Sequence, residues 1–278
     1  MKKSLIIKTR NCGFFSSIFQ VLDNVEYCYQ HNMKPIIELG PEFKYKNLEN
    51  NSWHEFFYEI NDGVIEGESI EIPQLHNGAL YLLDDYIMVS PLYGNFKSVI
   101  WENIENPELV SKYRQQINNT INKCLKPNDY IQNIVDNFVS ENFKNSMLGV
   151  HFRGTDFGYN DISSFISMIN MLLEQNNYSK LYIASDNQEA IKLLSDVFPN
   201  SCFYSTPYRT ESMNSTLPAF YIFSGEDMIK QGQSVLIESI LLSKCDGIVC
   251  INSAVAKFST CLNPEMPIHL VTRLHHQG

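Results

Sequence analysis

The sequence predicts an α/β protein whose second half is a doubly wound parallel sheet. Two observations carry this prediction. The chain opens with a strand, a helix and a second strand, an order that favours parallel pairing. In the second half, short apolar runs alternate with helical runs of about ten residues. We therefore expect two lobes, residues 1–144 and 145–278, with a boundary near residues 140–147.

The first lobe begins with a clear pattern. Residues 4–8 form a short β-branched run, and a polar turn with Gly13 follows it. Apolar side chains then recur at helical spacing over residues 14–31, which predicts an amphipathic helix. Residues 35–39 are predicted to form the second strand.

The rest of the first lobe is less regular. Between residues 40 and 100, aromatic residues alternate with acidic residues and glycine, so we expect short strands and long loops. Residues 107–144 are predicted to be helical, with Pro107 at a helix start and Pro127 between two helices. The second of these helices covers about residues 130–142.

The second lobe alternates strands and helices to its end. Strands are predicted over residues 147–152, 180–184, 202–204, 247–251 and 268–271. Helices are predicted over residues 162–175, 188–197, 233–243 and 254–261. This alternation is typical of a parallel sheet with helices on its faces.

The composition narrows the classes of function. The chain has 278 residues, of which 44% are apolar and 12% aromatic, enough for a packed core. It carries 21 Lys and Arg against 31 Asp and Glu, a formal net charge of −10. Nucleic-acid binders usually show a basic excess, so we expect no nucleic-acid partner. A small anionic ligand held by local arginines and helix N-termini is compatible with this charge.

The cysteines and the apolar runs bear on the cellular setting. Seven scattered cysteines without a Cys-x-x-Cys pair favour reduced thiols, and no cluster of Cys and His indicates a zinc site. No apolar run approaches the ~20 residues that span a bilayer, and residues 5–7 are too short for a signal-peptide core. We expect a cytoplasmic protein without a transmembrane segment or a metal, and leave peripheral membrane contact open.

Polar clusters follow four predicted strands of the second lobe. They lie at residues 151–156, 185–187, 205–209 and 252–253. Ligands of open α/β sheets bind beyond the carboxyl ends of the strands. The clusters therefore predict a polar crevice along one edge of the sheet.

Arg153 is the most informative residue of these clusters. Its guanidinium is always charged and matches phosphate oxygens with a forked pair of donors; the alternative is a salt bridge to Asp156. Asn252 and Ser253 open a helix whose dipole and N–H groups suit a phosphate. Both residue types are also ordinary N-caps, so that alternative stays open.

Three further residues each have two interpretations. His151 is either a structural histidine or a site residue, and its spacing to Arg153 and Asp156 favours the site. Asp186, together with Asn187, supplies either a helix cap or a group that binds the hydroxyls of a nucleotide ribose. Glu238 lies among apolar residues of a helix, where it is either solvated at the helix edge or accepts donors from a ligand such as a purine base.

Three segments of the second lobe form an ordered set of motifs. Residues 151–156 read His-Phe-Arg-Gly-Thr-Asp, and residues 181–187 read Leu-Tyr-Ile-Ala-Ser-Asp-Asn. Residues 236–240 place a Glu in a helix, and residues 245–253 form a strand that ends in Asn-Ser. Over about residues 147–262 they resemble the His-x-Arg-Arg-x-Asp, Ala-Thr-Asp-Asp and third motifs of the fucosyltransferase superfamily, which includes α1,2-, α1,6- and protein O-fucosyltransferases.

The resemblance implies a GT-B fold, in which two Rossmann-like lobes face a cleft. It implies that GDP-fucose is the donor, bound by the C-terminal lobe without a required metal or other cofactor. A glycan acceptor would lie against the N-terminal lobe, where the region around residues 41–100 is expected to shape its site. Asn11 and Gly13 lie in a turn similar to the family's first loop and are assigned to the acceptor side.

The resemblance also implies roles for the donor-side residues. Arg153 would neutralise the β-phosphate of the departing GDP, and Ser253 would contact the diphosphate. Glu238 and His151 would lie near the guanine and the ribose. The remaining donor-side assignments are Asp156, Asp186 and Asn252.

The base of the reaction is assigned in the same way. Asp161 lies five positions after Asp156, where α1,6-fucosyltransferases place a carboxylate as the base. The alternative for Asp161 is a helix N-cap for residues 162–175.

The sequence departs from the family's pattern at three positions. Gly154 stands where the family has its second Arg, Asn187 where it has its second Asp, and Ala254 where a second Ser is frequent. Arg209 and Lys257 are candidates for the missing cation.

Two classes of function stay open. The preferred one is an inverting glycosyltransferase that transfers fucose to a hydroxyl of a glycan or glycoconjugate. The alternative is a non-catalytic sugar-nucleotide or glycan-binding protein, which Gly154 favours.

Overall fold

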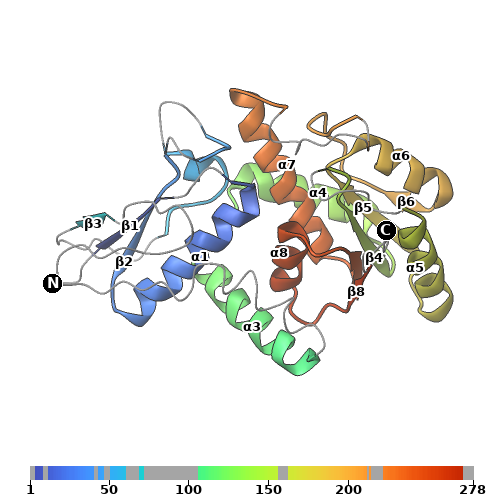
Figure 1. Ribbon diagram of the computed structural model, residues 1–278, viewed down its shortest axis with the longest axis horizontal. Helices are drawn as coiled ribbons and strands as arrows, with labels where there is room; N and C mark the ends of the chain where they lie inside the picture. Colours follow the sequence, from blue (N-terminus) through green and yellow to red (C-terminus); the bar gives the residue numbers. More distant parts are fainter. Residues whose placement is uncertain are drawn as a thin grey trace, which may run out of the picture. The chain divides into compact units, whose positions relative to one another are not determined.

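The computed structural model divides the chain into two compact units, Met1–Asp129 and Tyr130–Gly278 (Figure 1). It describes residues 4–8, 12–40, 43–46, 51–60, 69–71, 106–155, 162–211, 213 and 222–271. Each unit contains a parallel sheet with helices, so the predicted α/β class is confirmed. The boundary between the units lies at the start of α4 (Asp129–Asn142), whereas the sequence placed the lobe boundary near residue 144.

The first unit is built on a small parallel sheet with the order β2-β1-β3. Strand β1 (Ser4–Lys8) pairs with β2 (Lys34–Glu38) on one side and with β3 (Ser69–Glu71) on the other. Ile7 lies opposite Ile37 in the first ladder, and both side chains are buried. The predicted strand, helix and strand at the start of the chain are confirmed.

Helix α1 (Phe14–Gln30) connects the first two strands and buries an apolar stripe. Gly13 is its N-cap residue, with extended backbone angles and no side-chain cap. Helix α3 (Pro107–Cys124) packs against α1, and the Thr120 hydroxyl donates a hydrogen bond to Glu26 Oε2 at 2.8 Å between the two helices. Pro107 is the first residue of α3, as predicted, because its missing N–H would be unsatisfied there anyway.

The aromatic segment after β2 differs from the prediction. Residues 52–55 form a short 3₁₀ helix, η1 (Ser52–Glu55), instead of a strand. Asn51 fixes it, because its side-chain oxygen accepts from both Leu39 N at 2.9 Å and Trp53 N at 3.1 Å. The aromatic side chains around η1 form a buried core cluster: Phe43, Tyr45, Trp53, Phe56 and Phe57. Most of the region that is expected to shape the acceptor site, including residues 61–68 and 72–100, lies outside the described residues.

The second unit is built on a five-stranded sheet in which every neighbouring pair is parallel. In sheet order the strands are β6 (Ser201–Cys202), β5 (Lys180–Ser185), β4 (Met147–Phe152), β7 (Gly247–Cys250) and β8 (Ile268–Leu270). The central strand β4 is buried along its whole length, as expected for a sheet covered on both faces.

Helices cover both faces of this sheet. On one face, α5 (Ile162–Gln175) and α6 (Gln188–Val197) share a hydrophobic core with side chains of β4, β5 and β7. On the other face, α7 (Glu226–Ser243) contacts β4 and β5 and packs against α8 (Ala254–Leu262). Tyr182 of β5 also faces that side, where it contacts Phe138 of α4. The doubly wound arrangement predicted for the second half is therefore present.

Two elements of the second unit differ in extent from the prediction. Helix α7 begins at Glu226, seven residues before the predicted start at Gln233. The sequence did not indicate this start, because the first two turns are mostly polar and show little apolar periodicity. Gly225 precedes it with φ of +60°, a left-handed conformation that favours glycine. Strand β6 ends at Cys202, and the following residues leave the sheet as a loop. Among the described residues, no helix is both long and apolar enough to cross a bilayer.

The core of the second unit gives the first testable prediction. Ile169 is fully buried in α5, so Ile169→Ala should lower the free energy of unfolding by about 2–5 kcal/mol through lost burial and a cavity. Met171 on the same helix is 40% exposed, and Met171→Ala should change the free energy of unfolding by less than about 0.5 kcal/mol. Urea unfolding of both variants tests this, and equal losses would contradict the packing of α5.

Candidate functional site

The carboxyl ends of β4, β5 and β7 lie at one edge of the second unit's sheet and carry five of the ten predicted site residues. His151 lies near the end of β4, and Arg153 follows that strand. Asp186 follows β5, and Asn252 and Ser253 follow β7. Since β4 pairs in parallel with both β5 and β7, these residues come from three adjacent strands. The structure thus brings the predicted polar clusters to one edge.

His151 and Ser253 connect the end of β4 to the start of α8. His151 is 5% exposed, and its Nδ1 lies 3.2 Å from Ser253 Oγ. The same Ser253 oxygen accepts a hydrogen bond from Ala256 N at 3.1 Å and so caps α8. The N-cap alternative for Ser253 is therefore present, and its contact with a diphosphate stays a prediction.

The protonation state of His151 follows from its surroundings. Burial, with a smaller contribution from the charge of Arg153, lowers the pKa of His151 from 6.5 to about 3. The imidazole is therefore neutral near pH 7. A neutral ring has one nitrogen that donates and one that accepts. His151 can thus hold the Ser253 hydroxyl through one nitrogen and offer a single polar group with the other.

The loop after β4 is fixed by the carboxylate of Asp186. Gly154 N donates to Asp186 Oδ1 at 2.8 Å, and the Thr155 hydroxyl donates to Asp186 Oδ2 at 2.5 Å. Thr155 is buried, whereas Arg153, which precedes these two residues, is partly exposed. Asp186 therefore binds its own chain, a use that neither sequence interpretation foresaw.

The position of Asn187 leaves no room for a side chain at residue 154. A Cβ added to Gly154 would lie 2.8 Å from Asn187 Cβ, closer than real Cβ atoms approach. Asn187 is fully buried and holds its place, because Oδ1 accepts from Ala190 N at 2.8 Å and Nδ2 donates to Thr210 Oγ1 at 2.9 Å. Its N-cap role for α6 matches one of the sequence interpretations. The path of the chain at residue 187 thus excludes a side chain at residue 154.

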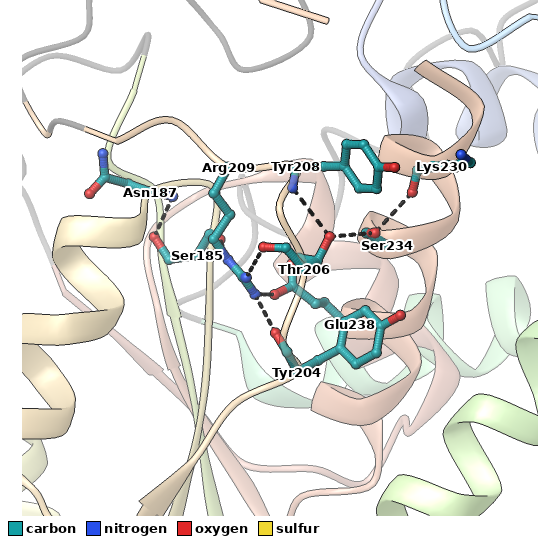
Figure 2. A network of polar contacts seen from close by, with 9 residues as sticks. All are labelled: Ser185, Asn187, Tyr204, Thr206, Tyr208, Arg209, Lys230, Ser234 and Glu238. Atoms are coloured by element: carbon teal, nitrogen blue, oxygen red, sulfur yellow. Dashed lines mark hydrogen bonds and ion pairs between the residues drawn. The ribbon is translucent and has the colours of Figure 1, made fainter. Parts of the chain in front are cut away.

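Arg209 is the centre of a buried polar network (Figure 2). Its guanidinium donates to Ser185 O at 2.9 Å, Thr206 O at 3.0 Å and Tyr204 O at 2.7 Å. It also forms an ion pair with Glu238 of α7. Arg209 is 6% exposed, so its donors serve the protein itself. The structure therefore does not support Arg209 as the replacement for the missing cation.

Glu238 has a partner that sequence reasoning missed. The side chain is 7% exposed, so it is not solvated at the helix edge, and Arg209 supplies its donor from within the chain. Burial raises the pKa of Glu238 from 4.5 to about 7, although the charge of Arg209 acts in the opposite direction. The signal in the sequence was a carboxylate among apolar helix residues, since a buried carboxylate needs a cation or donors nearby.

The same network attaches the loop after β6 to helix α7. The hydroxyls of Thr206 and Ser234 lie 2.9 Å apart, and Ser234 Oγ donates to Lys230 O at 2.9 Å (Figure 2). Tyr208 N donates to Thr206 Oγ1 at 3.3 Å. This loop therefore forms a fixed border of the sheet edge beside β5.

Several predicted residues cannot be placed in this way. Asn11, Asp156 and Asp161 lie outside the described residues. Gly13 lies in the first unit at the start of α1. Lys257, the other candidate for the missing cation, is 5% exposed within α8. Among the residues that the structure describes, no group of three or more His, Cys, Asp or Glu side chains has the arrangement of a metal site.

The fold of this chain is the GT-B fold of the fucosyltransferases, as the motifs predicted. The structure of the NodZ α-1,6-fucosyltransferase soaked with GDP-fucose has a TM-score of 0.57 and 16% identity, over 94% of this chain and 93% of that chain. NodZ from Bradyrhizobium has a TM-score of 0.56 and 15% identity, over 93% of this chain and 92% of that chain.

Two further structures with this fold extend the comparison. A mutant of FUT1 from Arabidopsis thaliana in complex with GDP has a TM-score of 0.56 and 11% identity, over 99% of this chain and 71% of that chain. POFUT1 in complex with GDP-fucose has a TM-score of 0.54 and 9% identity, over 96% of this chain and 97% of that chain. No family model matches the sequence, and no curated protein matches it. The likeness therefore lies in the fold.

His151 and Glu238 predict opposite dependences of stability on pH. The pKa of Glu238 is higher in the folded chain than its usual 4.5, so Glu238 lowers the free energy of unfolding as pH rises from 4.5 to about 7. The pKa of His151 is lower than its usual 6.5, so His151 lowers that free energy as pH falls from 6.5 to about 3.

Urea unfolding of the wild type, Glu238→Gln and His151→Gln across pH 4.5 to 7 measures both effects. The stability of the wild type minus that of Glu238→Gln should shrink as pH rises, because only the wild type carries that titration. The corresponding difference for His151→Gln should shrink as pH falls. Differences that move in the same direction would contradict one of the two assignments.

Proposed function

We propose that this protein is an inverting glycosyltransferase that transfers fucose from GDP-fucose to a hydroxyl of a glycan or glycoconjugate. The observation that carries the proposal is the set of groups at one sheet edge: Arg153, the neutral His151 and the N-terminus of α8. The fold supports it, because structures with the same fold were determined with GDP-fucose or GDP bound. The acceptor side is assigned to the first unit by resemblance alone.

The chemistry requires that negative charge be met on the departing GDP. The acceptor oxygen forms a bond to the anomeric carbon of fucose while the bond from that carbon to the β-phosphate oxygen breaks. The electron pair leaves with GDP, and the acceptor proton passes to a base, for which Asp161 stays a prediction. In this proposal Arg153 and the backbone N–H groups at the start of α8 stabilise the developing phosphate charge without a required metal.

The nucleotide preference tests the proposal directly. With EDTA present, GDP should raise the melting temperature more than UDP or CMP does, since binding to the folded state alone shifts unfolding by mass action. Equal shifts by the three nucleotides, or a shift that requires Mg²⁺, would count against a metal-independent GDP site.

Arg153 provides the test of leaving-group stabilisation. Arg153→Ala should lower kcat/KM for GDP release from GDP-fucose by roughly 10²-fold or more, because a charge-assisted donor is lost in the transition state. Arg153→Lys should recover little, because a point charge cannot reproduce the forked contact. Lys192→Ala, which removes an exposed cation of α6, is the control that should keep normal kinetics. Normal kinetics in both Arg153 variants would leave Arg153 with a structural role.

Gly154 favours a second candidate function. The close approach of Asn187 leaves no room for a second cation at residue 154, which weakens stabilisation of a leaving diphosphate. A non-catalytic protein that binds a sugar nucleotide or a glycan would not need that cation. GDP release from GDP-fucose, with and without glycan acceptors, separates the two. A protein that GDP stabilises but that releases no GDP would be the binding protein.

A further inference from the structure

The segment that carries Arg153 is held on both sides of that residue. On one side, Phe152 is the last residue of β4, is 1% exposed, and pairs in register with Ser185 of β5. On the other side, Gly154 N and the Thr155 hydroxyl both donate to the carboxylate of Asp186. The backbone of Arg153 therefore lies between two attachments to the same short stretch of chain at the end of β5.

The anchor itself is also fixed. Thr210 N donates to the backbone oxygen of Asp186 at 2.9 Å, and the Thr210 hydroxyl donates to the same oxygen at 3.1 Å. The next residue, Asn187, is buried and leaves no space for a side chain at Gly154. A carboxylate with so little freedom sets the path of the loop that it binds.

We propose that Asp186 and Thr155 are positioning residues that hold the Arg153 guanidinium in place for a diphosphate. This inference rests on the proposed function, because it names what prepares Arg153 for the nucleotide. Arg153 is partly exposed, and ordering its long side chain on binding costs free energy. A backbone that is already fixed on both sides adds no further cost of ordering the loop. Asp186 then acts through Arg153 and not through a contact with the ribose.

The two roles of Asp186 predict different losses. If Asp186 and Thr155 act through Arg153, their removal weakens binding of the diphosphate and leaves binding of the nucleoside unchanged. If Asp186 binds the ribose, its removal weakens guanosine and GDP alike. The ratio of the dissociation constants for GDP and guanosine therefore separates a positioning role from a direct contact, and also from a general loosening of the fold.

Thr155→Val is the main variant, because it removes the hydroxyl that donates to Asp186 and keeps the shape of the side chain. Titration calorimetry should show GDP bound about 10-fold more weakly, because the loosened loop must be ordered on binding, and guanosine bound as in the wild type. Thr155→Ser should restore GDP affinity, because its hydroxyl can reach the same oxygen. Asp186→Ala should show the same selective loss as Thr155→Val.

The double variant tests whether the effect passes through Arg153. Arg153→Ala combined with Thr155→Val should bind GDP no more weakly than Arg153→Ala alone, because the positioned group is already absent. The matched control is Thr120→Val, which removes a buried hydroxyl that donates to Glu26 in the first unit. It should lower the melting temperature in a comparable way and leave both affinities unchanged.

The outcomes separate the two levels of the proposal. A wild type that binds no GDP would overturn the proposed function and this assignment together. If the wild type binds GDP, the proposed function stands. Any of three results would then overturn the positioning role of Asp186 and Thr155. These are an unchanged GDP affinity in Thr155→Val, an equal loss for guanosine and GDP, and an additive loss in the double variant.

Discussion

The parallel ladder between β4 and β5 is the constraint on which the rest of the site depends. It places Phe152 opposite Ser185, so the loops that leave these strands start side by side. From that point Asp186 binds the loop after β4, and Asn187 packs against Gly154. A shift of one residue in this register would turn the side chains of β4 to the opposite face. Strand pairing alone therefore brings the polar residues after β4 and β5 together, whether or not a ligand is bound.

The ion pair between Arg209 and Glu238 holds the neighbouring part of this sheet edge, where the loop after β6 meets β5 and α7. A buried ion pair by itself often contributes little to stability, because both charges lose their hydration. Here the guanidinium also satisfies the backbone oxygens of Ser185, Tyr204 and Thr206. An apolar pair of the same volume would leave those carbonyls without this donor. The pair is therefore better understood as part of a network that binds the loop after β6 to β5 and α7 (Figure 2).

How far the sequence predicts the structure depends on whether the signal is local. The buried stripe of α1 and the strand at the centre of the second unit were predicted, because periodicity and β-branched runs are local. The start of α7 was missed, because its first turns are polar. The polar edge was predicted from strand ends, whereas the partners of Arg209 and Gly154 were not. Glu238 lies 29 positions from Arg209, and only the packed fold brings them together.

Gly154 and Asn187, two positions that depart from the fucosyltransferase motifs, lie against each other in the structure. An arginine at residue 154 would place its Cβ 2.8 Å from Asn187 Cβ, so the backbone there would have to move. That backbone donates to Asp186, so the movement would reach the segment next to Arg153. A close contact between two loops thus occupies the place of a second cation. In the proposed reaction one guanidinium carries more of the leaving-group charge, and an oriented donor spends less free energy on reorganisation than a mobile one. The fixed loop is then the means by which a site with a single arginine would meet that charge.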